Sequence, residues 1–94
     1  MKALTEVELA EVLEREPLWK LADGKLVREW KFKDFVAAMD FVNRVAAVAE
    51  EAGHHPDIDI RYNKVLLALV THDAGGITKR DASMAERLSR DFPG

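Results

Sequence analysis

The stretch EEAGHHPDIDIRYNKVLLALVTHD, residues 50–73, holds the end of one predicted helix, two predicted strands and all three histidines of the chain. Gly53 is expected to end the helix, because glycine readily adopts the left-handed conformation found just past helix ends. Residues 57–61 predict a short strand, and residues 64–72 predict a longer one. The longer segment has apolar residues at both odd and even positions, which predicts a strand buried on both faces.

A β-hairpin is predicted upstream of this stretch, at Asp23-Gly24. Type I′ turns need a positive φ at both central residues, and Asp-Gly is one of the pairs that provides it. The turn would join a strand at residues 18–21 to a longer strand at residues 26–32. On the longer strand, Arg28 is a polar exception to the face that carries Leu26, Trp30 and Phe32.

Capping signals predict where the first and last helices begin. Thr5 and Glu8 have the spacing of a capping box at the start of a helix over residues 5–15, and Thr78 and Asp81 repeat that spacing at the last helix. The predicted order of elements is therefore α-β-β-α-β-β-α. This order indicates an α+β fold with a four-stranded antiparallel sheet and helices packed on one face.

The helix predicted over residues 35–52 starts at Asp34, a residue type suited to cap a helix N-terminus. Its apolar residues exceed a single stripe. One face carries Phe35, Ala38, Val42, Val45 and Ala49, and a second face starts with Phe41, Val48 and Ala52. We expect the sheet to cover one of these faces and a partner subunit to cover the other.

The composition predicts one globular domain over residues 1–94, since 48% of the residues are hydrophobic. The absence of cysteine excludes disulfides, thiolate metal sites and cysteine nucleophiles. The net charge is −3 and both signs are interspersed, so no basic patch for nucleic acid or a membrane surface is predicted. Neither a signal peptide nor a membrane-length apolar run is recognisable. We therefore expect a cytoplasmic protein.

The three histidines lie at two junctions: His54 and His55 in the helix-to-strand loop, and His72 at the far end of the long strand. If the two strands are adjacent and antiparallel, the imidazoles meet at one edge of the sheet. Unrelated surface histidines are one interpretation. A zinc site is a second, although neighbouring residues of an extended segment point opposite ways, and no metal is predicted. The third is acid–base chemistry, because imidazole titrates near neutrality.

A longer spaced pattern surrounds the histidines. It reads Glu50, three residues, His54-His55-Pro56, five residues, Tyr62, nine residues, His72, eight residues, Asp81. Tyr62-Asn63-Lys64-Val65, Thr71-His72-Asp73, the GIT segment before the last helix, Trp19 and the WKFKDF segment accompany it. The pattern resembles the signature of the pterin-4a-carbinolamine dehydratase family over nearly the whole chain, and the predicted order of elements agrees with the family fold.

The resemblance implies a reaction without a metal or an organic cofactor. 4a-Hydroxytetrahydropterin would lose water to give quinonoid dihydropterin, which recycles the cofactor of aromatic amino acid hydroxylases. By similarity, His55 and His72 are the acid–base pair and His54 holds and polarises the pterin. The 4a-hydroxyl leaves readily only when protonated, and a ring N–H loses its proton as the C–O bond breaks.

Further residues have supporting roles by the same resemblance. Pro56, Thr71 and Asp73 would border the substrate. Glu50 is suited to orient a histidine, since a carboxylate fixes the tautomer of an imidazole. Asp81 is expected mainly as the capping partner of Thr78.

One position departs from the family pattern: Ile58 replaces a common aromatic residue, which predicts a change in the pocket wall or at a subunit contact. The second apolar face of the long helix, with Phe41 and Val48, predicts a homodimer or homotetramer. The alternative function is a non-enzymatic binding module for a protein partner, because relatives dock on a transcription factor through that helix.

Overall fold

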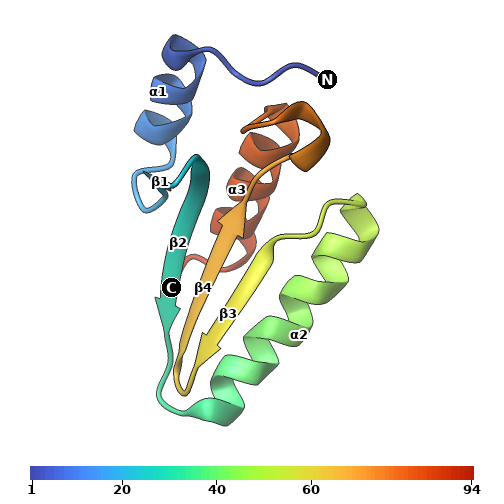
Figure 1. Cartoon of the computed structure of the whole chain (residues 1–94). Helices are drawn as coiled ribbons and strands as arrows, with labels where there is room; N and C mark the ends of the chain where they lie inside the picture. Colours follow the sequence, from blue (N-terminus) through green and yellow to red (C-terminus); the bar gives the residue numbers. More distant parts are fainter.

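The computed structural model describes residues 1–94 and confirms the predicted α+β class and the order of its elements. The four strands form one antiparallel sheet in the order β1-β2-β4-β3 (Figure 1). None of the helices combines the length and the apolar content that a membrane span requires. The elements are α1 (Glu6–Arg15), β1 (Lys20–Ala22), β2 (Lys25–Lys31), α2 (Phe35–Ala52), β3 (Asp57–Arg61), β4 (Lys64–Leu69), the 3-10 turn η1 (His72–Ala74) and α3 (Lys79–Asp91).

The turn between β1 and β2 confirms the predicted hairpin. Asp23 and Gly24 have φ values of 51° and 74°, both in the left-handed region that a type I′ turn needs. Leu21 pairs with Leu26 across the hairpin. The turn therefore fixes which face of β2 is directed at the helices.

The core lies on one face of the sheet. Alternate residues of β2 and β4 are buried, and they form one cluster with buried side chains of all three helices. The other face of β4 is only half-buried, so the prediction that this strand is covered on both sides is wrong for the single chain. The physical reason is that all three helices contribute to the same cluster, and none is left for the second face. The half-buried residues of this face are Leu66 and Ala68, and the half-buried Val70 follows just after the strand.

Arg28 is the polar residue that the sequence placed on the buried face of β2, and its exposed fraction is 4%. Its guanidinium donates to Ser89 Oγ at 3.0 Å and to the carbonyl oxygen of Pro93 at 3.3 Å, and it lies 4.0 Å from the ring centroid of Trp30. Burial lowers the pKa of Arg28, and the charge of Glu16 partly opposes that effect. The buried cation thus ties the C-terminal segment to the sheet.

An aromatic cluster joins α2 to the sheet. Phe41 is 4% exposed, with its ring centroid 4.9 Å from that of Trp30, 5.0 Å from that of Phe32 and 5.2 Å from that of Phe92. The prediction that Phe41 begins a second, outward apolar face is therefore wrong. The sheet twists and the C-terminal segment folds back, so a wider sector of α2 is covered from within the chain than one stripe would require.

The predicted helix ends are confirmed. Thr5 with Glu8 and Thr78 with Asp81 both form capping boxes, Asp34 accepts a hydrogen bond from the backbone of Ala37, and Gly53 has a φ of 65°. Hydrogen bonds from Thr5, above all the one from its backbone N–H, lower the pKa of Glu8. The end of β4 differs from the prediction, since the strand stops at Leu69 instead of His72.

Candidate functional site

Two segments that are distant in sequence meet at one end of the sheet, where β3 begins and β4 ends. The pair Asp57–Ala68 is the last in the antiparallel register at that end. The loop of residues 53–56 leads into β3, and residues 70–76 leave β4 at the same end (Figure 1). The sheet thereby brings the loop that carries His54 and His55 close to the segment that carries Thr71 and His72.

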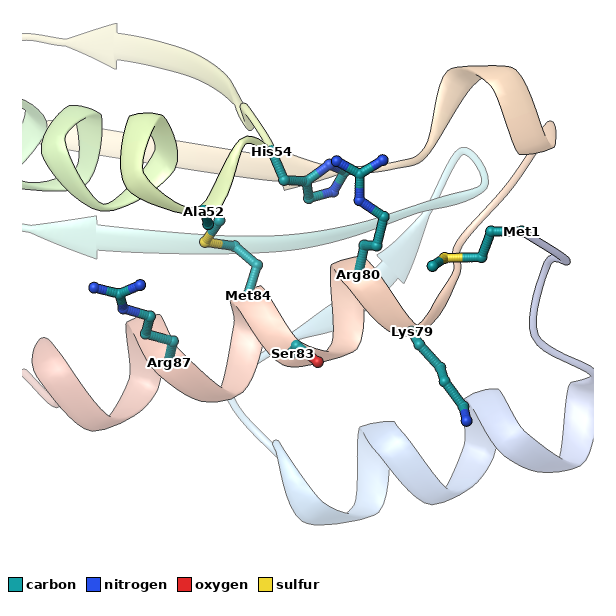
Figure 2. Close-up of a pocket in the computed structure, with 8 residues that line it drawn as sticks. All are labelled: Met1, Ala52, His54, Lys79, Arg80, Ser83, Met84 and Arg87. Atoms are coloured by element: carbon teal, nitrogen blue, oxygen red, sulfur yellow. The ribbon is translucent and has the colours of Figure 1, made fainter.

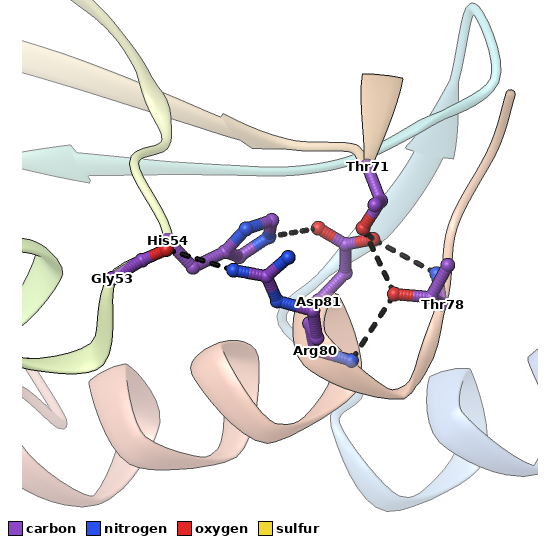
Figure 3. A network of polar contacts seen from close by, with 6 residues as sticks. All are labelled: Gly53, His54, Thr71, Thr78, Arg80 and Asp81. Atoms are coloured by element: carbon purple, nitrogen blue, oxygen red, sulfur yellow. Dashed lines mark hydrogen bonds and ion pairs between the residues drawn. The ribbon is translucent and has the colours of Figure 1, made fainter. Parts of the chain in front are cut away.

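A buried carboxylate connects the two segments. Asp81 has no exposed surface, and its Oδ1 lies 2.5 Å from Nε2 of His54 (Figure 3). Its Oδ2 accepts a hydrogen bond at 2.8 Å from the hydroxyl of Thr71 and another at 2.8 Å from the backbone N–H of Thr78. One carboxylate of α3 therefore holds the histidine loop, the segment after β4 and its own helix N-terminus together.

The direction of these hydrogen bonds follows from what each group can donate. An ionised carboxylate only accepts, so Nε2 of His54 carries a proton toward Asp81 and the hydroxyl of Thr71 donates to it. The hydroxyl of Thr78 then donates to that of Thr71 at 2.8 Å and accepts from the N–H of Arg80 at 3.2 Å. This assignment leaves Nδ1 of a neutral His54 as the unprotonated ring nitrogen.

His72 lies in a short closed loop. Thr71 and Gly76 form a backbone bridge, and the N–H of Gly75 donates to the carbonyl oxygen of His72 at 3.1 Å. Gly75 has a φ of 71°, which a side chain disfavours. These contacts fix the backbone of His72 while its side chain stays exposed, as does that of Asp73.

His55 is exposed and is held by a different carboxylate. Its Nε2 lies 2.8 Å from Oε2 of Glu50, in the last turn of α2. The two adjacent histidines thus face two carboxylates on different helices: His54 faces the buried Asp81 and His55 faces the exposed Glu50. Pro56, half-buried, follows directly and leads into β3.

The structure brings some of the predicted site residues into contact but not others. His54, Thr71 and Asp81 form one network, and Glu50 contacts His55. No hydrogen bond or ion pair joins His72 or Asp73 to the other histidines. No group of three or more His, Asp or Glu side chains is arranged to hold a metal ion.

Arg80 is a site residue that the sequence analysis missed. Its guanidinium donates to the carbonyl oxygen of Gly53 at 2.7 Å and lies beside the ring of His54 (Figure 3). The available signal was its position next to Asp81 in the GITKRD segment. Because Gly53 ends α2, this bond links the N-terminus of α3 to the loop that carries both histidines.

A pocket of about 330 Å³ opens beside His54, between the end of α2 and one side of α3 (Figure 2). Ala52 and Met84 form apolar parts of its lining, and Ser83 adds a hydroxyl. A volume near 300 Å³ lies at the lower end of the range for small-molecule sites. The pocket is the candidate for a bound molecule that contacts His54.

Comparison with known proteins adds a family match over most of the chain. Residues 2–90 match the family model described as Pterin 4 alpha carbinolamine dehydratase. A protein of Acidobacterium capsulatum, provisionally named a pterin-4-alpha-carbinolamine dehydratase, is 60% identical over 88 residues, which cover 94% of this chain and 96% of that protein. A similarly named protein of Chloroflexus aurantiacus is 54% identical over 88 residues, covering 94% and 95%.

Solved structures share the fold. A transcriptional coactivator/pterin dehydratase from Brucella melitensis superposes with a TM-score of 0.87 at 37% identity, covering 95% of this chain and 97% of that one. A pterin dehydratase-like protein identified as a RuBisCO assembly factor in the alpha-carboxysome superposes with a TM-score of 0.61 at 22% identity, covering 77% and 83%. At that identity the second likeness concerns the fold alone.

Proposed function

Because this chain belongs to the pterin-4-alpha-carbinolamine dehydratase family, whose named reaction is that of a hydro-lyase, we propose that it converts 4a-hydroxytetrahydropterin to quinonoid dihydropterin and water. The C4a–O bond breaks and a ring N–H loses its proton, so the substrate gives up one water molecule and no electrons. The reaction needs one group that protonates the leaving hydroxyl and one that accepts the ring proton. This step would recycle a tetrahydrobiopterin-type cofactor.

The observation that supports this proposal most is the Asp81 carboxylate shared by His54 and Thr71. It couples the loop of the paired histidines to the residue directly before His72. The side chains of His54 and Thr71, 17 positions apart in sequence, are thereby held at one end of the sheet. A flat bicyclic ring placed there would lie within reach of more than one imidazole.

The surroundings of the three histidines favour different roles. His54 is half-buried and fixed by Asp81, which suits a group that holds and polarises the pterin. His55 and His72 are exposed, which suits groups that exchange protons with solvent between turnovers. Glu50 orients His55 through the contact at 2.8 Å. In this proposal His55 and His72 are the acid–base pair.

The remaining predicted residues would border the ring. Pro56 and Asp73 flank the histidines on the two segments, and Thr71, whose hydroxyl donates to Asp81, lies directly before His72. Ile58, at the start of β3, pairs with Leu67 and is 38% exposed. An aliphatic side chain there offers less flat surface than an aromatic one.

The test is the rate at which the purified protein clears 4a-hydroxytetrahydropterin, followed by absorbance. We expect clearance well above the buffer rate, with a loss of about 10²-fold or more in His55→Ala plus His72→Ala, the range for removing positioned acid–base groups. The control is a second double variant, Val7→Ala plus Lys33→Ala, which replaces two exposed residues away from the histidines and should keep the wild-type rate. A wild-type rate equal to that of buffer, or a double variant as fast as the wild type, contradicts the proposal.

A role in protein docking is the second candidate function, and we propose α2 as the surface. Phe35 and Val36 are 49% and 76% exposed near the start of α2. The Brucella melitensis protein carries the name transcriptional coactivator beside pterin dehydratase. A homo-oligomer that buries the same two residues explains this exposed surface more simply.

We propose the cytoplasm as the compartment of this protein.

A further inference from the structure

The pocket beside His54 has a charge that the dehydration reaction does not require. Three of its lining residues are cations, Lys79, Arg80 and Arg87, and none is acidic (Figure 2). All three project from α3, with Arg80 beside the imidazole and the other two on either side of it along the helix. A 4a-hydroxytetrahydropterin ring carries no group that needs three cations.

Two of these cations form no ion pair. Neither Lys79 nor Arg80 takes part in any ion pair of the structure, and the one hydrogen bond from the Arg80 side chain goes to a carbonyl oxygen. Lys79 extends toward α1, where it lines a second pocket together with Glu8 and Glu11, and its charge adds to the lowering of the pKa of Glu8. Arg80 is therefore the cation of this pocket whose charge is most available to a ligand.

The third cation is paired, but only at the surface. Arg87 Nη2 lies 2.9 Å from Oε1 of Glu51, whose side chain is 71% exposed, and its Nε lies 3.7 Å from Asp91. An exposed pair of this kind contributes little, and its guanidinium keeps further N–H groups for a second acceptor. An arginine fork suits the oxygens of a phosphate or a carboxylate.

We infer that this pocket is a subsite for an anionic substituent carried by the pterin, either a phosphate monoester or a carboxylate at the end of the ring side chain. The inference rests on the proposed function, because it places the ring of the substrate against His54. The ring contacts the imidazole beside Arg80, while the side chain runs along α3 past Ser83 toward Arg87, and Lys79 at the other end of the pocket adds positive potential. The substrate class is then an anionic pterin, and a pterin with an uncharged side chain is the weaker ligand.

Binding constants of stable 7,8-dihydropterins test this inference without turnover. Three probes are titrated by calorimetry: one with a hydroxyalkyl side chain, one with a terminal phosphate on that chain, and one with a terminal carboxylate. We expect at least one anionic probe to bind about tenfold more tightly than the neutral probe, since each exposed ion pair adds a factor of a few. The preference should shrink in 1 M salt, which screens surface charges.

The phosphate and carboxylate arms identify the source of the charge, because the probe with the larger gain over the neutral one carries the preferred group. Arg87→Glu should lower the ratio of anionic to neutral affinity about fivefold or more, for loss of one ion pair and gain of one repulsion, and Lys79→Glu should lower it by less. Matched controls are Lys33→Glu and Arg44→Glu. Arg44 is also paired on its own helix, with Asp40, but lies away from this pocket.

Equal affinity for all three probes overturns the subsite, as does a preference that survives both pocket variants or disappears equally in the controls. This outcome is separable from failure of the proposed function. If the neutral substrate is dehydrated but no probe is preferred, only the subsite fails. If no pterin is dehydrated but an anionic probe binds through Lys79 and Arg87, only the proposed reaction fails.

Discussion

The side chain of Asp81 both caps α3 and holds His54. One oxygen accepts from the backbone N–H of Thr78 and so completes the cap of α3, and the other accepts from His54. Buried carboxylates are costly unless several donors compensate them, and here three donors do so. The stability of the helix start and the orientation of the histidine thus depend on the same group.

Asp81→Asn tests the orienting role. The amide can still accept from the N–H of Thr78, but it presents an NH₂ group or a weaker acceptor to Nε2 of His54. We expect kcat/KM for 4a-hydroxytetrahydropterin to fall about 10- to 100-fold, by analogy with the loss of carboxylates that orient metal-binding histidines. Steady-state absorbance kinetics measure the effect, together with the NMR signals of the His54 ring.

The matched control is Glu8→Gln, which removes the carboxylate of the other capping box, at α1, where no histidine is in contact. It should leave kcat/KM within about twofold of the wild type, as expected for an exposed surface change. If Glu8→Gln slows the enzyme as much as Asp81→Asn, or if Asp81→Asn leaves the tautomer of His54 and the rate unchanged, the orienting role is refuted.

Glu8 itself gives a pH prediction. Its pKa in the folded chain lies below the ordinary value of 4.5, mainly because the backbone N–H of Thr5 donates to the ionised carboxylate. This contribution to the start of α1 is present above pH 4.5 and is lost as the pH falls through the lower, folded pKa. NMR shifts of the Thr5 amide should follow that titration below pH 4.5. A midpoint above 4.5, or the same curve in Glu8→Gln, would contradict it.

At the residue scale, the sequence predicts local hydrogen bonds better than contacts between residues that are distant in sequence. The spacing of Thr78 and Asp81 predicted the capping box, which uses only local hydrogen bonds. The contact between Asp81 and His54 spans 27 positions and depends on how α3 lies against the end of α2, so no local pattern could predict it. The role of Arg80 was missed for the same reason.

At the element scale, the end of α2 determines where the paired histidines lie. Gly53 has a φ of 65°, and a Cβ built there would meet no atom within 4 Å. Gly53→Ala therefore strains the backbone without a clash and should cost about 1–2 kcal/mol of unfolding free energy. Because His54 and His55 follow directly, we also expect kcat/KM to fall.

Gly24→Ala is the control for this strain. Gly24 has a φ of 74° in the hairpin turn and is equally uncrowded, but it lies far from the histidines in sequence and belongs to another loop. Denaturant unfolding should show similar losses for both variants, and kinetics should show a loss for Gly53→Ala alone. Equal kinetic effects would mean that the end of α2 does not position the site.

The elements also show where periodicity is informative and where it fails. Helix ends and the Asp23-Gly24 turn were predicted because each depends on a backbone conformation that few residues adopt. The covering of each face was predicted wrongly, both for β4 and for Phe41 of α2. The residues of β4 are apolar on both faces of the strand, and those of α2 are apolar over a wide sector of the helix. The sequence alone does not show which other elements pack against these surfaces.

Phe41 allows a quantitative test of the corrected core. The ring of Phe41 is buried against Trp30, Phe32 and Phe92. Phe41→Ala should therefore lower the unfolding free energy of the protein by about 3–5 kcal/mol. Val7→Ala, at a position 69% exposed on α1, should change it by less than about 0.5 kcal/mol. Urea unfolding followed by circular dichroism measures both. A loss below about 1 kcal/mol for Phe41→Ala would contradict this burial and would mean that the residue lies on the surface of α2.

At the scale of the whole molecule, the second sheet face and the start of α2 leave apolar surface uncovered in the single chain. We predict a homo-oligomer, a dimer or a tetramer, whose mass falls in Val36→Glu because a charge would enter an apolar contact. Light scattering over a range of concentrations measures the mass. The control Val7→Glu also replaces an exposed valine by a charged residue, but on α1, and it should leave the mass unchanged. A monomer at all concentrations in the wild type contradicts the prediction.

The fold brings two distant segments to one end of the sheet, and every functional proposal depends on that placement. A crystal structure of the protein soaked with a 7,8-dihydropterin tests it most directly. We predict the ring within hydrogen-bonding distance of His54 and of at least one of His55 and His72, with the bond from Asp81 to His54 kept. A ring bound elsewhere, or His72 directed away from a ring that His54 holds, would contradict the account.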